Sequence, residues 1–143
     1  FRAGTPVSAR IKPMVADLTL ADSVKAALKG FDFTHFFTAW ARQASKAENI
    51  RVNGAVVSNV LDTLAKGPSS LQHIALLTGL KHYLGPFEAY AIGAVPETPF
   101  RESQDRQKVE NFYYEQEDRV FAAAARQALP RACIARIRSS ETR

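Results

Sequence analysis

The chain has 143 residues, of which 46% are hydrophobic and 23% are charged, which is enough for one globular domain with a buried core. The formal net charge is +5, but four arginines against one acid in segment 129–143 supply most of it, so a nucleic-acid partner is not expected. A single cysteine and three scattered histidines indicate neither a disulfide framework nor a metal site. No apolar run reaches membrane-spanning length and no secretory signal is visible, so we expect a cytoplasmic protein with no membrane partner.

The first forty residues predict two strands and a helix between them. Residues 1–10 are loop-like, and a short strand is expected at Lys12–Ala16. A helix is predicted from Asp22 to Lys29, ended by Gly30. The run Thr34–Trp40 predicts the next strand, which ends in polar and aromatic residues.

A long helix is predicted from Ala44 to Ala65, where apolar residues recur along one face. Asn53 is the polar exception on that face. A buried amide is most often structural and hydrogen-bonded, so we expect Asn53 to be scaffolding.

The stretch 71–118 holds the strongest candidate for a functional site. The apolar run Ile74–Leu77 shows no alternation and predicts a parallel strand covered on both faces. Lys81 follows the carboxyl end of this strand, which is where open α/β sheets bind their ligands. A helical pattern begins at about Lys108 and places Tyr113 on its inward face.

The order of strands and helices predicts an α/β fold with a partial Rossmann-like, doubly wound parallel sheet of about three strands and flanking helices. A glycine-rich dinucleotide fingerprint, which normally lies in the first strand-to-helix turn, is absent from the sequence. We therefore expect a partial domain at residues 1–128 that lacks the first βαβ unit.

Two motifs, TGLKHYLGPFEAY and VENFYYEQED, resemble the progesterone 5β-reductase and iridoid synthase family, an atypical branch of the extended short-chain dehydrogenases/reductases. Members of this family are NAD(P)H-dependent enzymes that reduce the carbon-carbon double bond of an enone. The resemblance implies that Lys81 and Tyr113, 32 residues apart, form the catalytic pair. The ordinary short-chain dehydrogenase signature, a tyrosine followed four places later by a lysine, is absent because residue 117 is a glutamate.

The implied chemistry suits these two residue types. Hydride delivery to an enone drives negative charge onto its carbonyl oxygen, to which the Tyr113 hydroxyl can donate a hydrogen bond. The Lys81 ammonium favours anionic character nearby and could lower the pKa of the tyrosine. Apart from the resemblance, an inward tyrosine is more often packed core, and a lysine after a strand is more often solvated.

The resemblance also implies a cofactor, NADPH or NADH, held along the strand ends. The residues implied in cofactor binding are Asp17, Leu18, Thr38, Ala39, Trp40, Thr78 and Gly79. Asp17 and Leu18 would lie beside the adenine, and Thr38 to Trp40 near the ribose and nicotinamide. Asp17 is equally well explained as a turn or cap residue, and Trp40 as core.

The segment 129–143 departs from the family. Relatives continue with a Val-His-Arg-Pro-His-Ser-Ile-Ile-Gly type segment that leads to the substrate-binding part. Codons for that segment, read one nucleotide later, encode residues 133–141 of this chain, Cys-Ile-Ala-Arg-Ile-Arg-Ser-Ser-Glu. We interpret 129–143 as an aberrant basic tail produced by out-of-frame translation, so the chain resembles an internal fragment without the C-terminal substrate-binding part.

The leading interpretation is a fragment of an NAD(P)H-dependent enone reductase whose partner is a small-molecule enone. The fragment itself is expected to be inactive, because it lacks the phosphate-binding turn. The alternatives are a non-catalytic truncated remnant or interaction module, and a short-chain dehydrogenase or epimerase acting on another carbonyl or sugar-nucleotide substrate. The sequence leaves a homodimer open.

Overall fold

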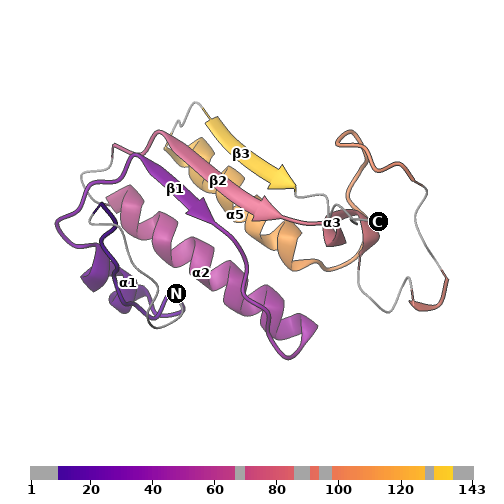
Figure 1. Ribbon diagram of the computed structural model, residues 1–143, viewed down its shortest axis with the longest axis horizontal. Helices are drawn as coiled ribbons and strands as arrows, with labels where there is room; N and C mark the ends of the chain where they lie inside the picture. Colours follow the sequence, from indigo (N-terminus) through magenta and orange to yellow (C-terminus); the bar gives the residue numbers. More distant parts are fainter. Residues whose placement is uncertain (1–9, 67–69, 86–90, 94–97, 128–130, 137–143) are drawn as a thin grey trace.

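The computed structural model describes residues 10–66, 70–85, 91–93, 98–127 and 131–136 (Figure 1). Three strands form one parallel sheet in the order β1-β2-β3, namely β1 (His35–Thr38), β2 (His73–Thr78) and β3 (Arg131–Arg136). The predicted α/β class with a parallel sheet is therefore confirmed.

Among the described residues, the helices that accompany the sheet are α1 (Ala21–Leu28), α2 (Lys46–Lys66), α3 (Lys81–Leu84) and α5 (Phe112–Arg126). Helices α2 and α5 lie side by side behind the sheet, and α1 packs against α2 (Figure 1). Both connections between neighbouring parallel strands advance in the same direction across the sheet, and connections of one hand then place their helices on the same face.

The core lies between the sheet and this pair of helices. Its buried members are Val24, Val57, Val60, Leu61, Leu64, Leu71, Ile74, Leu76, Val120 and Ala123. In β2, Ile74 and Leu76 are fully buried, whereas Leu77 is 37% exposed. The expectation that this strand is covered on both faces thus holds for one face only, because the described helices that contact β2 lie on that face.

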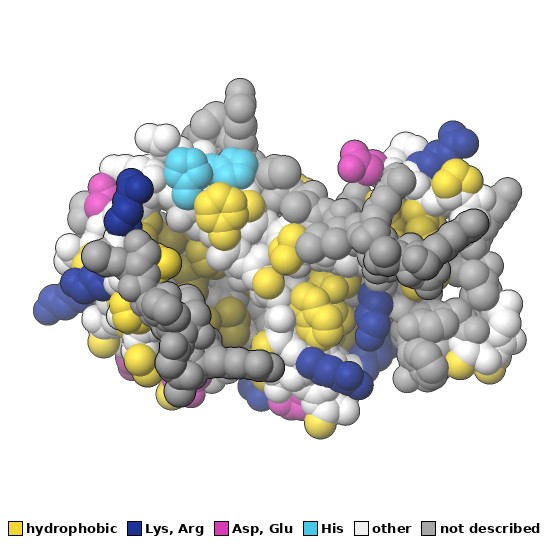
Figure 2. All heavy atoms as spheres, in the orientation of Figure 1, with side chains coloured by type: hydrophobic (Ala, Val, Ile, Leu, Met, Phe, Trp, Pro, Cys, Tyr) yellow, Lys and Arg dark blue, Asp and Glu magenta, His cyan; other side chains and the backbone are white. Residues whose placement is uncertain are grey.

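The other face of the sheet carries aromatic side chains. Figure 2 shows histidine and hydrophobic side chains next to one another on this face. The His35 and His73 rings lie 5.8 Å apart, and Phe37, 71% exposed, packs against both. This part of the sheet is open in the chain as described.

The prediction of a strand at Lys12–Ala16 is wrong. The backbone there is irregular, and Val15 is 99% exposed. A strand needs a neighbour to pair its main-chain groups, and within the described residues no strand lies beside this segment. The third strand is instead β3, which pairs with β2 in a register that runs from His73 opposite Arg131 to Thr78 opposite Arg136. Residues 131–136 lie in the segment that the sequence set apart as a tail.

The remaining boundaries differ little from expectation, except at α5. This helix begins at Phe112 rather than near Lys108, because Asn111 has an extended backbone and its side chain accepts a hydrogen bond from the Tyr113 amide. Gly30 has a φ of 79°, a conformation that favours glycine, and it turns the chain away two residues after α1 ends at Leu28. In the described part of the chain, no helix has both the length and the apolar character needed to cross a membrane.

Candidate functional site

Tyr113 lies in the first turn of α5 and is only 3% exposed. Its hydroxyl oxygen lies against the turn that follows β2, so close that a Cβ atom at Gly79 would come within 3.1 Å of it. A glycine at position 79 therefore leaves the space that the phenol occupies. The carboxyl end of β2 and the start of α5 meet at this point.

Lys81 begins α3, two residues after Gly79, and its side chain is exposed. It lines a cleft of about 310 Å³ together with Trp40, Arg42, Gln43, Ala44, Ser45, Lys46, Asn49, Gly85, Glu110, Asn111 and Phe112. The Asn111 amide donates a hydrogen bond of 2.8 Å to the Lys81 carbonyl oxygen. The two residues of the predicted catalytic pair thus belong to the same edge of the sheet, Lys81 in the cleft wall and Tyr113 buried beside it.

An aromatic cluster joins the cleft to Tyr113. The Trp40 ring lies 4.9 Å from the Phe112 ring and meets the Tyr113 ring edge-on at 6.1 Å. Trp40 is half-buried. It is thus packed against the aromatic rings and also lines the cleft, and its implied role in cofactor binding stays a prediction.

Burial sets the protonation state of Tyr113. Removal of the phenol from water raises the pKa of Tyr113 to about 12, because the charged phenolate loses its hydration. This direction is opposite to the lowering by Lys81 that the sequence suggested. At neutral pH the hydroxyl keeps its proton and can act as a hydrogen-bond donor.

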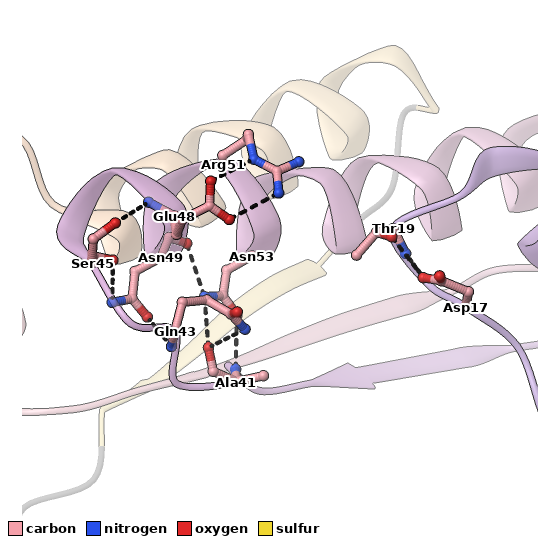
Figure 3. Close-up of polar contacts among 9 residues, drawn as sticks. All are labelled: Asp17, Thr19, Ala41, Gln43, Ser45, Glu48, Asn49, Arg51 and Asn53. Atoms are coloured by element: carbon pink, nitrogen blue, oxygen red, sulfur yellow. Dashed lines mark hydrogen bonds and ion pairs between the residues drawn. The ribbon is translucent and has the colours of Figure 1, made fainter.

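Asn53 holds the loop that follows β1 (Figure 3). Its side-chain oxygen accepts a hydrogen bond of 2.7 Å from the Ala41 amide, and its nitrogen donates to the carbonyl oxygens of Ala41 at 3.0 Å and Asn49 at 2.9 Å. One turn earlier on α2, the side-chain oxygen of Asn49 accepts a hydrogen bond of 2.9 Å from the Gln43 main-chain amide. The scaffolding role expected for Asn53 is confirmed, and the loop that it holds carries Trp40.

The other residues implied in cofactor binding, Thr38, Ala39, Thr78 and Gly79, lie at or just after the ends of β1 and β2, where two buried polar atoms lack a described partner. The Thr78 hydroxyl oxygen and the Gln116 side-chain oxygen are buried without a hydrogen-bond partner among the described residues. The Gln116 nitrogen donates a long hydrogen bond of 3.5 Å to the Ala39 carbonyl oxygen, and Thr38 donates to the same oxygen at 3.3 Å. Buried polar atoms that lack a partner often belong to a ligand or water site.

Asp17 and Leu18 do not line this cleft. The Asp17 carboxylate accepts hydrogen bonds from the Thr19 amide at 2.9 Å and hydroxyl at 2.6 Å, which lower the pKa of Asp17 (Figure 3). The Leu18 carbonyl oxygen accepts from the Asn59 side chain at 3.0 Å. In this chain Asp17 is a turn residue before α1, which is the alternative that the sequence left open.

Two polar residues near the site were not predicted from the sequence. Asn111 follows the ordinary preference for asparagine before the first turn of a helix, so the capping rule could have found it. Glu117 is 1% exposed and lies 3.0 Å from the His82 ring nitrogen Nδ1, a contact that no local pattern predicts. Desolvation opposes its charge, but His82 and Arg106 outweigh this cost and hold the pKa of Glu117 below its usual value.

Within the described ranges, no group of three or more histidine, cysteine or acidic side chains could hold a metal ion.

Comparison with known proteins identifies relatives of the chain. It is 38% identical over 107 residues, or 73% of its length, to a 3-oxo-Delta(4,5)-steroid 5-beta-reductase of Arabidopsis thaliana. It is also 41% identical over 98 residues, or 68% of its length, to an (S)-8-oxocitronellyl enol synthase of Camptotheca acuminata, and 41% identical over 91 residues to one of Nepeta racemosa. No family model matches the chain.

These matches cover 27%, 25% and 23% of the respective relatives, so the chain spans about a quarter of the length of the curated relatives it matches. The resemblance drawn from the two motifs is confirmed as homology over about two thirds of the chain.

Proposed function

We propose, from the homology of this chain to steroid 5β-reductases and 8-oxocitronellyl enol synthases, that it supplies the catalytic edge of an NAD(P)H-dependent reductase. The proposed reaction is 1,4-addition of hydride to a small-molecule enone, which saturates its carbon-carbon double bond. The relatives are named as reductases and synthases, which supports an enzyme of this kind.

One observation carries this proposal: residues from two motifs far apart in the sequence meet at one edge of the sheet. The Tyr113 hydroxyl lies against Gly79, two residues before Lys81, and Asn111 bonds the Lys81 carbonyl oxygen. Ligands of open α/β sheets bind at the carboxyl ends of the strands, which is where these residues lie.

The side chains suit the charge that the reaction develops. Tyr113 keeps its proton at neutral pH because burial raises the pKa of Tyr113 to about 12, so the phenol can donate a hydrogen bond to the carbonyl oxygen of an enone. That bond strengthens as the oxygen becomes an enolate. Lys81 lines the adjacent cleft, and we propose that its ammonium adds positive charge near the developing enolate.

The residues present fit the nicotinamide end of the cofactor better than its phosphates. The buried oxygens of Thr78 and Gln116, which have no partner among the described residues, could bond a nicotinamide amide, whereas the space at Gly79 is filled by the Tyr113 phenol. The bound nicotinamide would supply the hydride. The sequence holds no glycine-rich turn for the diphosphate, so we propose that the chain alone binds the cofactor weakly.

The experiment compares NADPH oxidation in the presence of cyclohexenone by this chain and by a version extended with the dinucleotide-binding βαβ unit of a relative at its N-terminus and with that relative's substrate-binding part at its C-terminus. We expect turnover in the extended protein, and we expect Tyr113→Phe to lower its kcat by about a hundredfold, since one donor to a developing oxyanion is removed. Tyr83→Phe is the matched control, because it removes a hydroxyl from a ring that stacks on Phe100. Equal turnover for Tyr113→Phe and the control would exclude Tyr113 from the reaction.

A second candidate function is an interaction module without catalysis. The observation that favours it is the open face of the sheet, where exposed Phe37 packs against the His35 and His73 rings. Analytical ultracentrifugation tests whether the chain self-associates through this face. A dimer that Phe37→Ser dissociates, together with no turnover in the extended protein, would favour this function over reduction.

A further inference from the structure

The proposed catalytic pair comes from two separate helices, which raises the question of what sets its geometry. In the ordinary tyrosine and lysine signature the two residues lie four places apart on one helix, so the helix itself fixes their separation. Here Lys81 lies on α3, Tyr113 lies on α5, and the place four residues after Tyr113 is taken by Glu117. The separation of Lys81 and Tyr113 must therefore be fixed by a contact between α3 and α5.

Glu117 makes such a contact with the residue next to Lys81. One of its carboxylate oxygens, Oε1, lies 3.0 Å from Nδ1 of His82, and the other, Oε2, accepts a hydrogen bond of 2.8 Å from Arg106. Both His82 and Glu117 are almost completely buried. Arg106 also donates to Asp118 at 2.6 Å, and its guanidinium lies 5.0 Å from the centre of the Tyr114 ring.

The main chain of α3 is held from the same side. Three consecutive carbonyl oxygens each accept a hydrogen bond from a side chain of α5 or of the segment before it. Asn111 donates to Lys81 and Tyr114 donates to His82 at 2.6 Å, while Gln107 donates to Tyr83. These bonds hold the backbone of Lys81, while its exposed side chain forms part of the cleft wall.

We propose that Glu117 is a positioning residue, which clamps His82 against α5 and thereby fixes Lys81 relative to Tyr113. The proposal rests on the proposed reaction for its catalytic consequence, but the clamp itself is a structural relationship. Glu117 does not line the cleft, so it acts through Lys81 rather than on the substrate. A buried carboxylate keeps its charge only with partners close to it, and those of Glu117 include His82 at 3.0 Å and Arg106 at 2.8 Å.

The first arm of the test needs no activity. Hydrogen-deuterium exchange is measured on the amides of α3, which form hydrogen bonds from His82 to Gly79, Tyr83 to Leu80 and Gly85 to Lys81. We expect Glu117→Gln to speed their exchange by about tenfold relative to the amides of β1. Glu115→Gln is the matched control, because Glu115 lies on the same helix and pairs with Arg119 away from α3. Unchanged exchange of α3 in Glu117→Gln would overturn the clamp.

The second arm uses the extended protein and cyclohexenone. We expect Glu117→Gln to lower kcat by about tenfold with KM nearly unchanged, because the lysine is misplaced rather than removed. In a Lys81→Ala background the same substitution should have no further effect, whereas a general loss of folding would lower both proteins equally. An equal loss in the two backgrounds would overturn the positioning role.

Two further outcomes are informative. If Glu117→Gln does not fold, Arg106→Gln removes the other partner of the same carboxylate from a side chain that is 35% exposed, and the same exchange result is expected. If the extended wild-type protein reduces no enone, the proposed reaction fails, and the exchange measurement decides the clamp by itself.

Discussion

The Asn111 side chain joins the starts of two helices. Its nitrogen donates a hydrogen bond of 2.8 Å to the Lys81 carbonyl oxygen at the start of α3, and its oxygen accepts one of 3.0 Å from the Tyr113 amide at the start of α5. One amide therefore links the backbones of both proposed catalytic residues. The two bonds use different atoms of the side chain, so substitutions can separate them.

We predict different effects for two substitutions of Asn111. Asn111→Ala removes both bonds and should lower the free energy of unfolding by about 1–2 kcal/mol. Asn111→Asp keeps an acceptor for the Tyr113 amide and adds a negative charge at the helix N-terminus, so we expect a loss of under about 0.5 kcal/mol. Both lose the donor to Lys81 and should lower kcat in the extended protein. Urea unfolding and NADPH oxidation measure the two quantities, and full activity of Asn111→Asp would contradict the role of this bond.

Gly79 tests how closely the Tyr113 hydroxyl must approach the turn after β2. A methyl group at position 79 would lie 3.1 Å from the hydroxyl oxygen, so Gly79→Ala should displace the phenol by a few tenths of an ångström. We expect a destabilisation of about 1 kcal/mol from this crowding. In the Tyr113→Phe background the hydroxyl is absent and the cost should largely vanish, which a double-mutant cycle of urea unfolding measures. Equal costs in the two backgrounds would show that the crowding lies elsewhere.

Much of the fold is predictable from local patterns. Hydrophobic periodicity predicts α1 and α2 to within two residues, and apolar runs predict β1 and β2. The failure at Lys12–Ala16 has a tertiary cause, because an apolar run becomes a strand only where a neighbour can pair with it. The same dependence on neighbours explains β3, which forms beside the central strand β2 in a segment that had no structural prediction.

The residues of the site likewise fall into those that local sequence predicts and those that it does not. Lys81 and Tyr113 are marked by motifs, and Asn111 obeys the capping rule. Glu117 reads as a surface acid in the charged run Glu115 to Asp118, yet it is buried. Its partner His82 lies far away in sequence, so only the packing of α3 on α5 reveals the pair. Burial of an ionised group depends on tertiary contacts, which local sequence does not predict.

Asn53 should contribute more to stability than an exposed asparagine on the same helix. It is buried and makes three hydrogen bonds to main-chain atoms of Ala41 and Asn49, so Asn53→Ala should cost about 2–4 kcal/mol through lost bonds and unsatisfied partners. Asn59→Ala is the control, because Asn59 makes one exposed bond to Leu18. The chain has a single tryptophan, Trp40, on the loop that Asn53 holds. Its fluorescence should therefore change in Asn53→Ala, and an unchanged spectrum with unchanged stability would contradict this role.

The buried carboxylate of Glu117 should make stability depend on pH in the acid range. The pKa of Glu117 is depressed in the folded protein, against the cost of desolvation, by His82 and Arg106. A depressed carboxyl pKa means that the unfolded chain binds the proton more readily, so the stabilisation is present above the unfolded pKa and is lost as pH falls through the folded pKa.

This pH dependence predicts how two glutamine variants differ. Glu117→Gln should lower the free energy of unfolding at neutral pH by about 3 kcal/mol, since a buried pair loses one partner, and the difference from wild type should shrink as pH falls. Glu48→Gln is the control, because Glu48 pairs with Arg51 on the exposed side of α2 and solvent screens that pair. Urea unfolding between about pH 2.5 and pH 7 measures both differences. A constant difference for Glu117→Gln across this range would show that its carboxylate is not the group whose ionisation stabilises the fold.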